Sequence, residues 1–172
     1  MYSVIGMGEE ERVTILEGIM ATQPIDGQVE GNKQVVREML ASISSGDDSG
    51  FLARLSPNYA RHCQAMPPGL QEIRGPDMMG EWLAANRVTF PDYREEIEWL
   101  GGEGEFVAWR SRGRGTMTGA MGPFPATGKT MDLVIIGVHR FEAGELAETW
   151  TSWDNLAALT QLGLMPAGSH SE

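Results

Sequence analysis

Residues 129–163 read KTMDLVIIGVHRFEAGELAETWTSWDNLAALTQLG, and their hydrophobic pattern changes period along the way. Residues 129–141 and 144–153 are rich in β-branched and aromatic side chains, which is typical of β-strands. The EAG sequence that joins them is short and contains glycine, as a hairpin loop should. Residues 155–162 then have leucines at helical spacing, and Asp154 precedes them as a suitable N-cap. This segment predicts a β-hairpin followed by a short helix.

Two earlier segments have the same composition and predict two further strands, at residues 93–100 and 104–119. GGEG at 101–104 is expected to form a hairpin loop, and MGPFPATG at 121–128 a longer loop between the middle strands. The four strands together predict an antiparallel meander.

The first half of the chain has helical periodicity instead. A helix is expected from Asn32, its N-cap, to Gly46, because one stripe is apolar. A short helix is expected at residues 51–55, ending before Pro57, and a longer one at 75–90. The apolar positions expected inside these helices are Val35, Val36, Met39, Leu40, Ile43, Met79, Trp82, Leu83 and Val88.

Helices followed by an antiparallel meander predict an α+β fold in which a curved sheet packs on the helices and encloses an apolar pocket. We expect one domain at residues 32–166 and a short tail at 167–172. Residues 1–31 are expected to form an N-terminal arm, with a short helix at 9–20 and an aperiodic linker at 22–32.

The overall charge excludes several classes of partner. The 172 residues include 24 acidic and 13 basic ones, a net charge of -11. Such a surface repels nucleic acids and anionic membranes, so neither is expected as a partner. No apolar run is long enough to span a membrane, and no targeting segment is recognisable, so we expect a cytoplasmic protein. One cysteine, Cys63, and three scattered histidines predict neither a disulfide nor a metal site.

Several short motifs follow one another in a recognisable order. Together they resemble the SnoaL-like polyketide cyclases, also called SnoaL-like ester cyclases, of the NTF2-like superfamily. The motifs are Tyr59-x-x-His62, PPG at 67–69, FPD at 90–92, GTMTG at 115–119, HRF at 139–141 and E-x-W-x-x-W-D-N-L with QLG at 148–163.

The resemblance implies a cone-shaped α+β barrel with a deep apolar pocket, assembled as a homodimer or homotetramer. It also implies closure of a ring in a polyketide-like small molecule by intramolecular aldol condensation, with no cofactor and no metal. By the same resemblance Asp154 would be the acid/base and His139 the assisting group. The side chains expected to bind the substrate are Tyr59, His62, Trp82, Phe90, Met117 and Trp150.

Asp154 has two possible roles, as a helix cap and as an acid/base. Trp150 shares strand parity with Ser152 and Asp154, so all three are expected to face inward. Burial beside Trp150 and Trp153 would make the carboxylate a stronger base. The direction of His139 stays open, because both faces of its strand are apolar.

Met117 stands where the family motif commonly reads GTHTG. Methionine cannot transfer protons, so the pocket is more apolar there or the substrate differs.

The fold alone does not determine the activity, so other functions stay open. Epoxide hydrolysis would need two aspartates and an arginine. Asp154 and Arg112 could contribute, but residues 106–118 contain no second aspartate. Arg110, Arg112 and Arg114 alternate along one strand, which favours a solvated sheet face. Isomerase or dehydratase activity and non-catalytic binding of a small molecule are the remaining alternatives.

Overall fold

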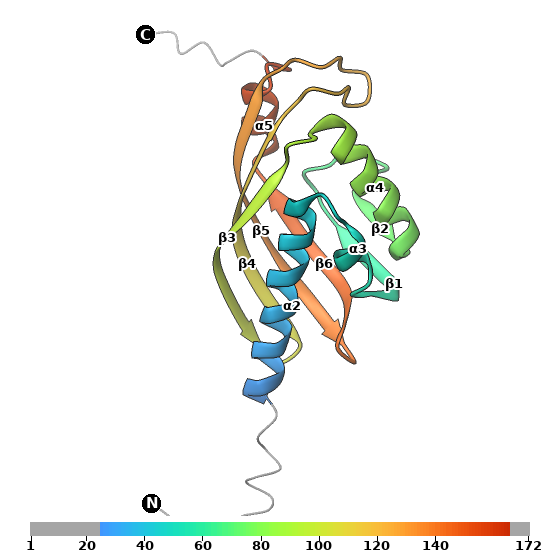
Figure 1. Ribbon diagram of the computed structural model, residues 1–172, viewed down its shortest axis with the longest axis vertical. Coiled ribbons are helices and arrows are strands. Elements are labelled where there is room, and N and C mark those ends of the chain that lie inside the picture. Colours follow the sequence, from blue (N-terminus) through green and yellow to red (C-terminus); the bar gives the residue numbers. More distant parts are fainter. Residues whose placement is uncertain (1–24, 166–172) are drawn as a thin grey trace, which may run out of the picture.

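The computed structural model describes residues 25–165, and it has an α+β fold built on one curved sheet (Figure 1). The strands pair in the order β2-β1-β6-β5-β4-β3. Their bounds are β1 Leu55–His62, β2 Glu72–Arg74, β3 Arg94–Glu103, β4 Phe106–Thr116, β5 Thr130–Glu142 and β6 Glu145–Trp153. The helices of the described part are α2 Ile25–Ser45, α3 Ser49–Leu52, α4 Gly75–Thr89 and α5 Asn155–Gln161.

The predicted meander is confirmed, since β3, β4, β5 and β6 are successive antiparallel neighbours. Side chains alternate strictly along β4, where Val107, Trp109 and Ser111 are buried. The turn between β5 and β6 contains Ala143 and Gly144 with φ of 51° and 84°. Positive φ at both positions matches the twist of a two-residue hairpin turn.

The loop predicted between β3 and β4 is shorter than expected. β3 continues through Glu103 and pairs with Phe106, so only residues 104–105 turn. The residues of GGEG that precede Gly104 therefore belong to the sheet.

The strand β1 was not predicted, and the expected helix at 51–55 is wrong beyond Leu52. Pro57 looked like a helix stop, but it lies inside β1. The register between β1 and β6 shifts between Leu55 and Ala60, so proline interrupts no regular ladder there. β1 runs parallel to β6, which makes the sheet mixed and not wholly antiparallel.

The long helix α2 starts at Ile25, so the N-cap predicted at Asn32 is wrong. Asn32 is a buried mid-helix residue, because its side chain faces the sheet on the same stripe as Val36. The linker expected at 22–32 is helical from Ile25 onward. The short helix expected at 9–20 and the tail at 167–172 lie outside the described residues.

The predicted helices α4 and α5 are confirmed. Pro76 lies in the first turn of α4, where its missing N–H has no helical partner to lose. Met79 and Leu83 are buried, but Val88 is 71% exposed, so its expected core position is wrong.

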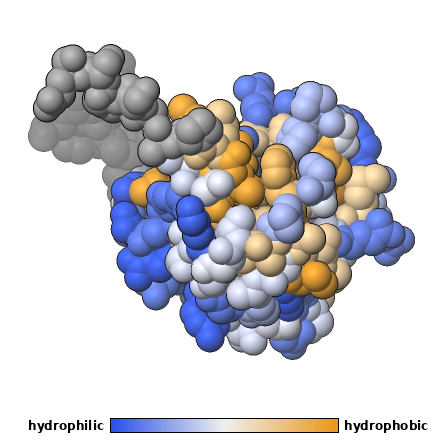
Figure 2. All heavy atoms as spheres, turned by 90° about the horizontal axis from the view of Figure 1, so that it is seen from above, coloured by the Kyte–Doolittle hydropathy of each residue, from blue (hydrophilic) through white to orange (hydrophobic). Residues whose placement is uncertain are grey.

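Figure 1 shows α2, α3 and α4 against one side of the curved sheet. The main core lies between them and combines α2, α3 and α4 with inward-facing residues of the strands. A smaller cluster of Phe90, Met117 and Leu162 closes the end that carries α5. Viewed from that end, the surface has a hydrophobic area with hydrophilic side chains around it (Figure 2). In residues 25–165, no helix is both long and apolar enough to cross a membrane.

The packing of the main core can be tested at Leu146, a fully buried residue near the start of β6. Leu146→Ala is expected to lower the free energy of unfolding by about 2–5 kcal/mol, because it removes buried methyl groups and leaves a cavity. Leu156, 62% exposed on α5, provides the control. Leu156→Ala should change stability by about 0.5 kcal/mol or less in urea titrations. Equal losses for both variants would contradict this packing.

Candidate active site

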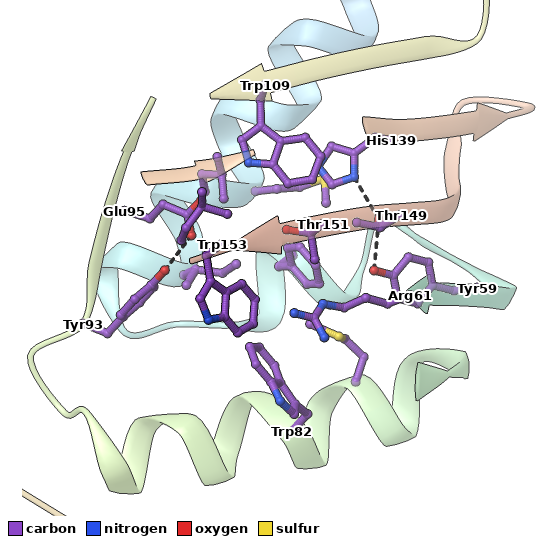
Figure 3. A pocket seen from close by; sticks show the side chains of 16 residues that line it. Tyr59, Arg61, Trp82, Tyr93, Glu95, Trp109, His139, Thr149, Thr151 and Trp153 are labelled. Atoms are coloured by element: carbon purple, nitrogen blue, oxygen red, sulfur yellow. Dashed lines mark hydrogen bonds between the residues drawn. The ribbon is translucent and has the colours of Figure 1, made fainter. Parts of the chain in front are cut away.

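A cavity of about 90 Å³ lies between the helices and the inner face of the sheet. Its apolar walls come from α2, α3, α4 and β5, and three tryptophans, Trp82, Trp109 and Trp153, contribute large rings. Polar side chains also face it, from β1, β3, β5 and β6 and from the residue before β3 (Figure 3). They are Tyr59, Arg61, Tyr93, Glu95, His139, Thr149 and Thr151.

His139 faces this cavity from β5 and is almost fully buried. Its Nδ1 lies 2.9 Å from the Thr149 hydroxyl, which accepts a hydrogen bond from the Tyr59 hydroxyl at 3.1 Å. Thr149 has no other side-chain partner among the described residues, so it can donate its single proton to Nδ1. This direction of the chain places the imidazole proton on Nε2.

Burial determines the charge of His139. The His139 ring stacks on Trp109, with centroids 4.0 Å apart and planes at 10°. Removal from water lowers the pKa of His139 to about 3. The ring is therefore neutral at pH 7, and it can act as a neutral hydrogen-bond donor but not as an imidazolium acid.

Gly137 makes the stacking of Trp109 on His139 possible. It faces Trp109 across the β4–β5 ladder. A Cβ at position 137 would collide with the Trp109 ring and with the Trp150 carbonyl oxygen. Any larger residue would push the indole off the histidine.

Glu95 brings a carboxylate to the cavity from β3. Oε1 accepts a hydrogen bond from the Ser111 hydroxyl at 2.5 Å, and Oε2 accepts one from the Tyr93 hydroxyl at 2.8 Å. Burial, followed by the negative charge of Glu95, raises the pKa of Tyr93 well above its usual value. Tyr93 therefore stays protonated, and its hydroxyl donates a hydrogen bond to Glu95. Two hydroxyl donors therefore set the orientation of the Glu95 carboxylate.

Arg61 supplies the positive charge of the cavity. The residue is only 5% exposed, and its guanidinium lies 4.5 Å from the Trp82 ring centroid and 6.0 Å from that of Trp153. Nη1 is buried without a hydrogen-bond partner in the described part of the chain. Nε1 of Trp109, which also lines the cavity, is likewise buried without a hydrogen-bond partner in the described part of the chain.

Asp154 is exposed and does not line the cavity. Its Oδ1 accepts a hydrogen bond from the backbone N–H of Ala157 at 2.9 Å, so the predicted N-cap is confirmed. The inward direction predicted for Trp150, Ser152 and Asp154 is wrong. The opposite parity of β6 faces inward and brings Thr149, Thr151 and Trp153 to the cavity.

Trp150 and His62 lie together on the outer face of the sheet. Trp150 is 40% exposed and stacks on His62, with centroids 5.7 Å apart. His62 Nε2 lies 2.9 Å from a carboxylate oxygen of Glu148. The expectation that Trp150 and His62 contact the substrate in the pocket therefore disagrees with their positions in the sheet.

Of the four other residues predicted to bind the substrate, two line the cavity and two do not. Tyr59 and Trp82 line the cavity, and their contact with a substrate stays a prediction. Phe90 and Met117 are buried in the small cluster beside α5 and do not line it. Met117, fully buried there, fills a core position because Phe90 and Leu162 pack around it.

Sequence reasoning missed Arg61, Glu95 and Ser111. Glu95 could have been found, because it shares strand parity with Tyr93 and Ile97 in an otherwise charged segment. Arg61 shares parity with Tyr59, but that signal requires β1 to be recognised first. Among residues 25–165, no group of His, Cys, Asp or Glu side chains is placed to hold a metal ion.

Residues 33–162 match the family model of the SnoaL-like polyketide cyclases, so the chain belongs to this family. This membership supports a cyclase-type function at the level of the family. No protein with a curated description matches the chain significantly in sequence.

Solved structures confirm the NTF2-like fold. IdmH of Streptomyces antibioticus, a proposed polyketide cyclase, is 25% identical with a TM-score of 0.65, over 76% of this chain and 97% of that one. AclR of Streptomyces galilaeus, a proposed hydroxylase, is 24% identical with a TM-score of 0.69, over 80% and 84%. A Catenulispora acidiphila protein with a ketosteroid isomerase-like fold is 14% identical with a TM-score of 0.65, over 77% and 93%.

The buried state of His139 predicts a specific dependence of stability on pH. Its pKa in the folded chain, about 3, is below the usual histidine value of 6.5. The unfolded chain therefore binds the extra proton first, and stability falls as pH drops from about 6.5 towards 3. The contribution is at most about 1.4 kcal/mol per pH unit.

Urea titrations from pH 7 to pH 4 can measure this dependence. In His139→Gln, the fall in stability with pH should be shallower than in the original protein, whatever its stability at pH 7. The difference isolates His139, because all other groups titrate in both proteins. Parallel curves would show that His139 is not held neutral by the fold.

Proposed function

We propose that the protein is a cofactor-independent cyclase that closes a ring in a polyketide-like or other polycyclic small molecule by intramolecular aldol condensation. The observation that supports this best is the joint presence of a carboxylate, Glu95, and a neutral histidine, His139, in one cavity. Aldol closure needs a base for a C–H proton and a donor for the enolate oxygen.

In this proposal Glu95 removes the proton alpha to a substrate carbonyl. The hydroxyls of Tyr93 and Ser111 hold its carboxylate in place. Each oxygen still has a free lone-pair direction, because a carboxylate accepts about four hydrogen bonds.

His139 stabilises the enolate oxygen that forms. The Tyr59–Thr149–His139 chain keeps the ring proton on Nε2, and stacking on Trp109 holds the ring plane. Because the ring is neutral, its Nε2–H can polarise a carbonyl by a hydrogen bond, and it does not give up its proton to Glu95. The enolate carbon then attacks the second carbonyl, and the alkoxide takes the proton back from Glu95.

The cavity must enlarge to accept such a substrate. Its 90 Å³ is well below the roughly 300–1,000 Å³ of ordinary small-molecule pockets. Trp82 is only partly buried and projects from α4, so its rotation is the simplest way to widen the space.

The hydrolase alternative is less well supported by the geometry. Arg112, its expected arginine, lies on the other side of the sheet and pairs with Glu98 and Asp132. Non-catalytic binding remains the outcome to be distinguished by experiment.

Two conservative variants test the proposed acid/base. Glu95→Gln should lower turnover at least about 100-fold, because it removes the base and keeps the volume. Asp154→Asn should leave turnover and stability unchanged, since Asn caps a helix about as well as Asp. The readout is deuterium exchange at the carbon alpha to the carbonyl of aromatic polyketones, followed by NMR in D₂O with EDTA.

The reverse result would assign the acid/base role to Asp154, as the family resemblance implies. Undiminished exchange in both variants would contradict catalysis by either carboxylate. Binding of the polyketones without any exchange in the original protein would favour the non-catalytic module.

We further propose that the protein is a homodimer that pairs through the outer face of its sheet. In the described part no helix covers this face, and Ile136 and Trp99 are 54% and 56% exposed on it. Large exposed apolar side chains on a sheet face typically mark a protein interface.

Ile136→Glu should shift the sedimentation velocity of the protein from that of a dimer to that of a monomer, because it buries a charge in the interface. Val88→Glu, at a 71% exposed position on α4, is the matched control and should leave the dimer intact. A monomeric original protein, or a dimeric Ile136→Glu variant, would rule out this interface.

A further inference from the structure

The buried guanidinium of Arg61 forms no direct ion pair in the described protein. Among residues 25–165 no carboxylate forms an ion pair with the guanidinium, and its Nη1 is buried there without a hydrogen-bond partner. Arg87 shows the usual arrangement. Although it is more exposed than Arg61, it donates to Asp48 at 2.5 Å and to the carbonyl oxygen of Ile43 at 3.1 Å.

A buried charge without a partner costs free energy, so Arg61 without a bound anion lowers the stability of the fold. Trp82 and Trp153 offset part of this cost through cation–π contact with the guanidinium. These contacts use the faces of the indole rings and leave the N–H groups of Arg61 without acceptors. Figure 3 shows the guanidinium directed into the space beside Trp82 and Trp153.

The cavity also has a second donor without an acceptor, Trp109 Nε1. Two buried donors at one cavity indicate a ligand that brings oxygen atoms. Inside the cavity Glu95 accepts hydrogen bonds from Tyr93 and Ser111, and Thr149 accepts one from Tyr59, but neither is placed to accept one from Arg61 or Trp109.

We propose that Arg61 binds a carboxylate group of the substrate, so that the substrate is an aromatic or polycyclic carboxylic acid. This inference rests on the proposed function and adds the chemical class of the substrate. A guanidinium pairs with a carboxylate through two parallel hydrogen bonds, and the two flanking indoles favour a planar, conjugated acid.

A monoanion fits the charges of the cavity better than a phosphate does. Glu95 already contributes one negative charge, which Arg61 balances when the cavity is empty. A carboxylate leaves one excess negative charge, whereas a phosphate dianion would leave two and would need further cations. No lysine and no second arginine lines the cavity in the described chain.

The strand register gives the orientation of the acid. Arg61 pairs with Thr149, and Thr149 pairs with His139, so the three residues form one row across β1, β6 and β5. Neighbouring strands lie about 4.8 Å apart, which separates the main chains at Arg61 and His139 by about 10 Å. The carboxylate therefore lies several bonds from the carbonyl that His139 contacts.

Benzoate and benzamide test this inference, because they share shape and differ in charge. Isothermal titration calorimetry at low salt should show benzoate binding at least about tenfold more tightly than benzamide. Arg61→Met should abolish the preference. Arg37→Met, which removes an exposed arginine of α2 away from the cavity, should keep it.

Equal binding of benzoate and benzamide to the original protein would overturn the inference, and so would a preference that survives in Arg61→Met. If Arg61→Met does not fold, Arg61→Lys replaces it and should weaken benzoate binding while retaining part of the preference. An unchanged benzoate affinity in Arg61→Lys would equally overturn the carboxylate site.

Failure of the proposed function would give a result different from failure of the carboxylate site. Glu95→Gln should still prefer benzoate even though it loses proton exchange. A preference for benzoate in a protein that exchanges no alpha protons would refute the cyclase and leave the carboxylate site standing.

Discussion

Trp109 lies flat on His139, and Gly137 on the next strand leaves the room for its ring. This contact removes His139 from water and keeps the imidazole neutral at physiological pH. A neutral ring can in turn be held by the hydroxyl chain from Tyr59 through Thr149, since no charge needs to be solvated. The polar side of the cavity is therefore organised around one aromatic stack.

The two charged side chains of the cavity, Arg61 and Glu95, are held apart by separate contacts. Arg61 and Glu95 both face inward, yet they do not form an ion pair with each other. Glu95 is held by the Tyr93 and Ser111 hydroxyls, and Arg61 by two indole rings. Two opposite charges kept apart in a small apolar space create an electric field across it.

The two faces of the sheet have separate uses. Strand alternation places the cavity groups on the helix side, while Trp150, His62 and Arg112 lie on the other side with their own stacks and ion pairs. The acid/base assigned from the resemblance, Asp154, belongs to neither set, because the strand has ended and its carboxylate caps α5. The carboxylate that does line the cavity is that of Glu95, from β3.

The sequence by itself determined the elements whose signals are local. Hydrophobic period and turn residues were sufficient for the β3–β6 meander, for α4 and α5, and for the cap at Asp154, because each depends on neighbours in the chain. The family motifs were sufficient for the NTF2-like fold. β1 escaped because Pro57 and polar neighbours hide a strand that is stabilised by pairing with β2 and with β6, the latter far along the chain.

The tertiary structure decided which side chains meet. A shift of one residue in strand parity moves every side chain to the opposite face, so Thr149, Thr151 and Trp153 face the cavity while Trp150 and Asp154 do not. The isolation of Arg61 and the approach of Glu95 to Ser111 likewise depend on the register between distant strands. Pairing across the sheet sets these positions, and it is a property of the folded chain as a whole.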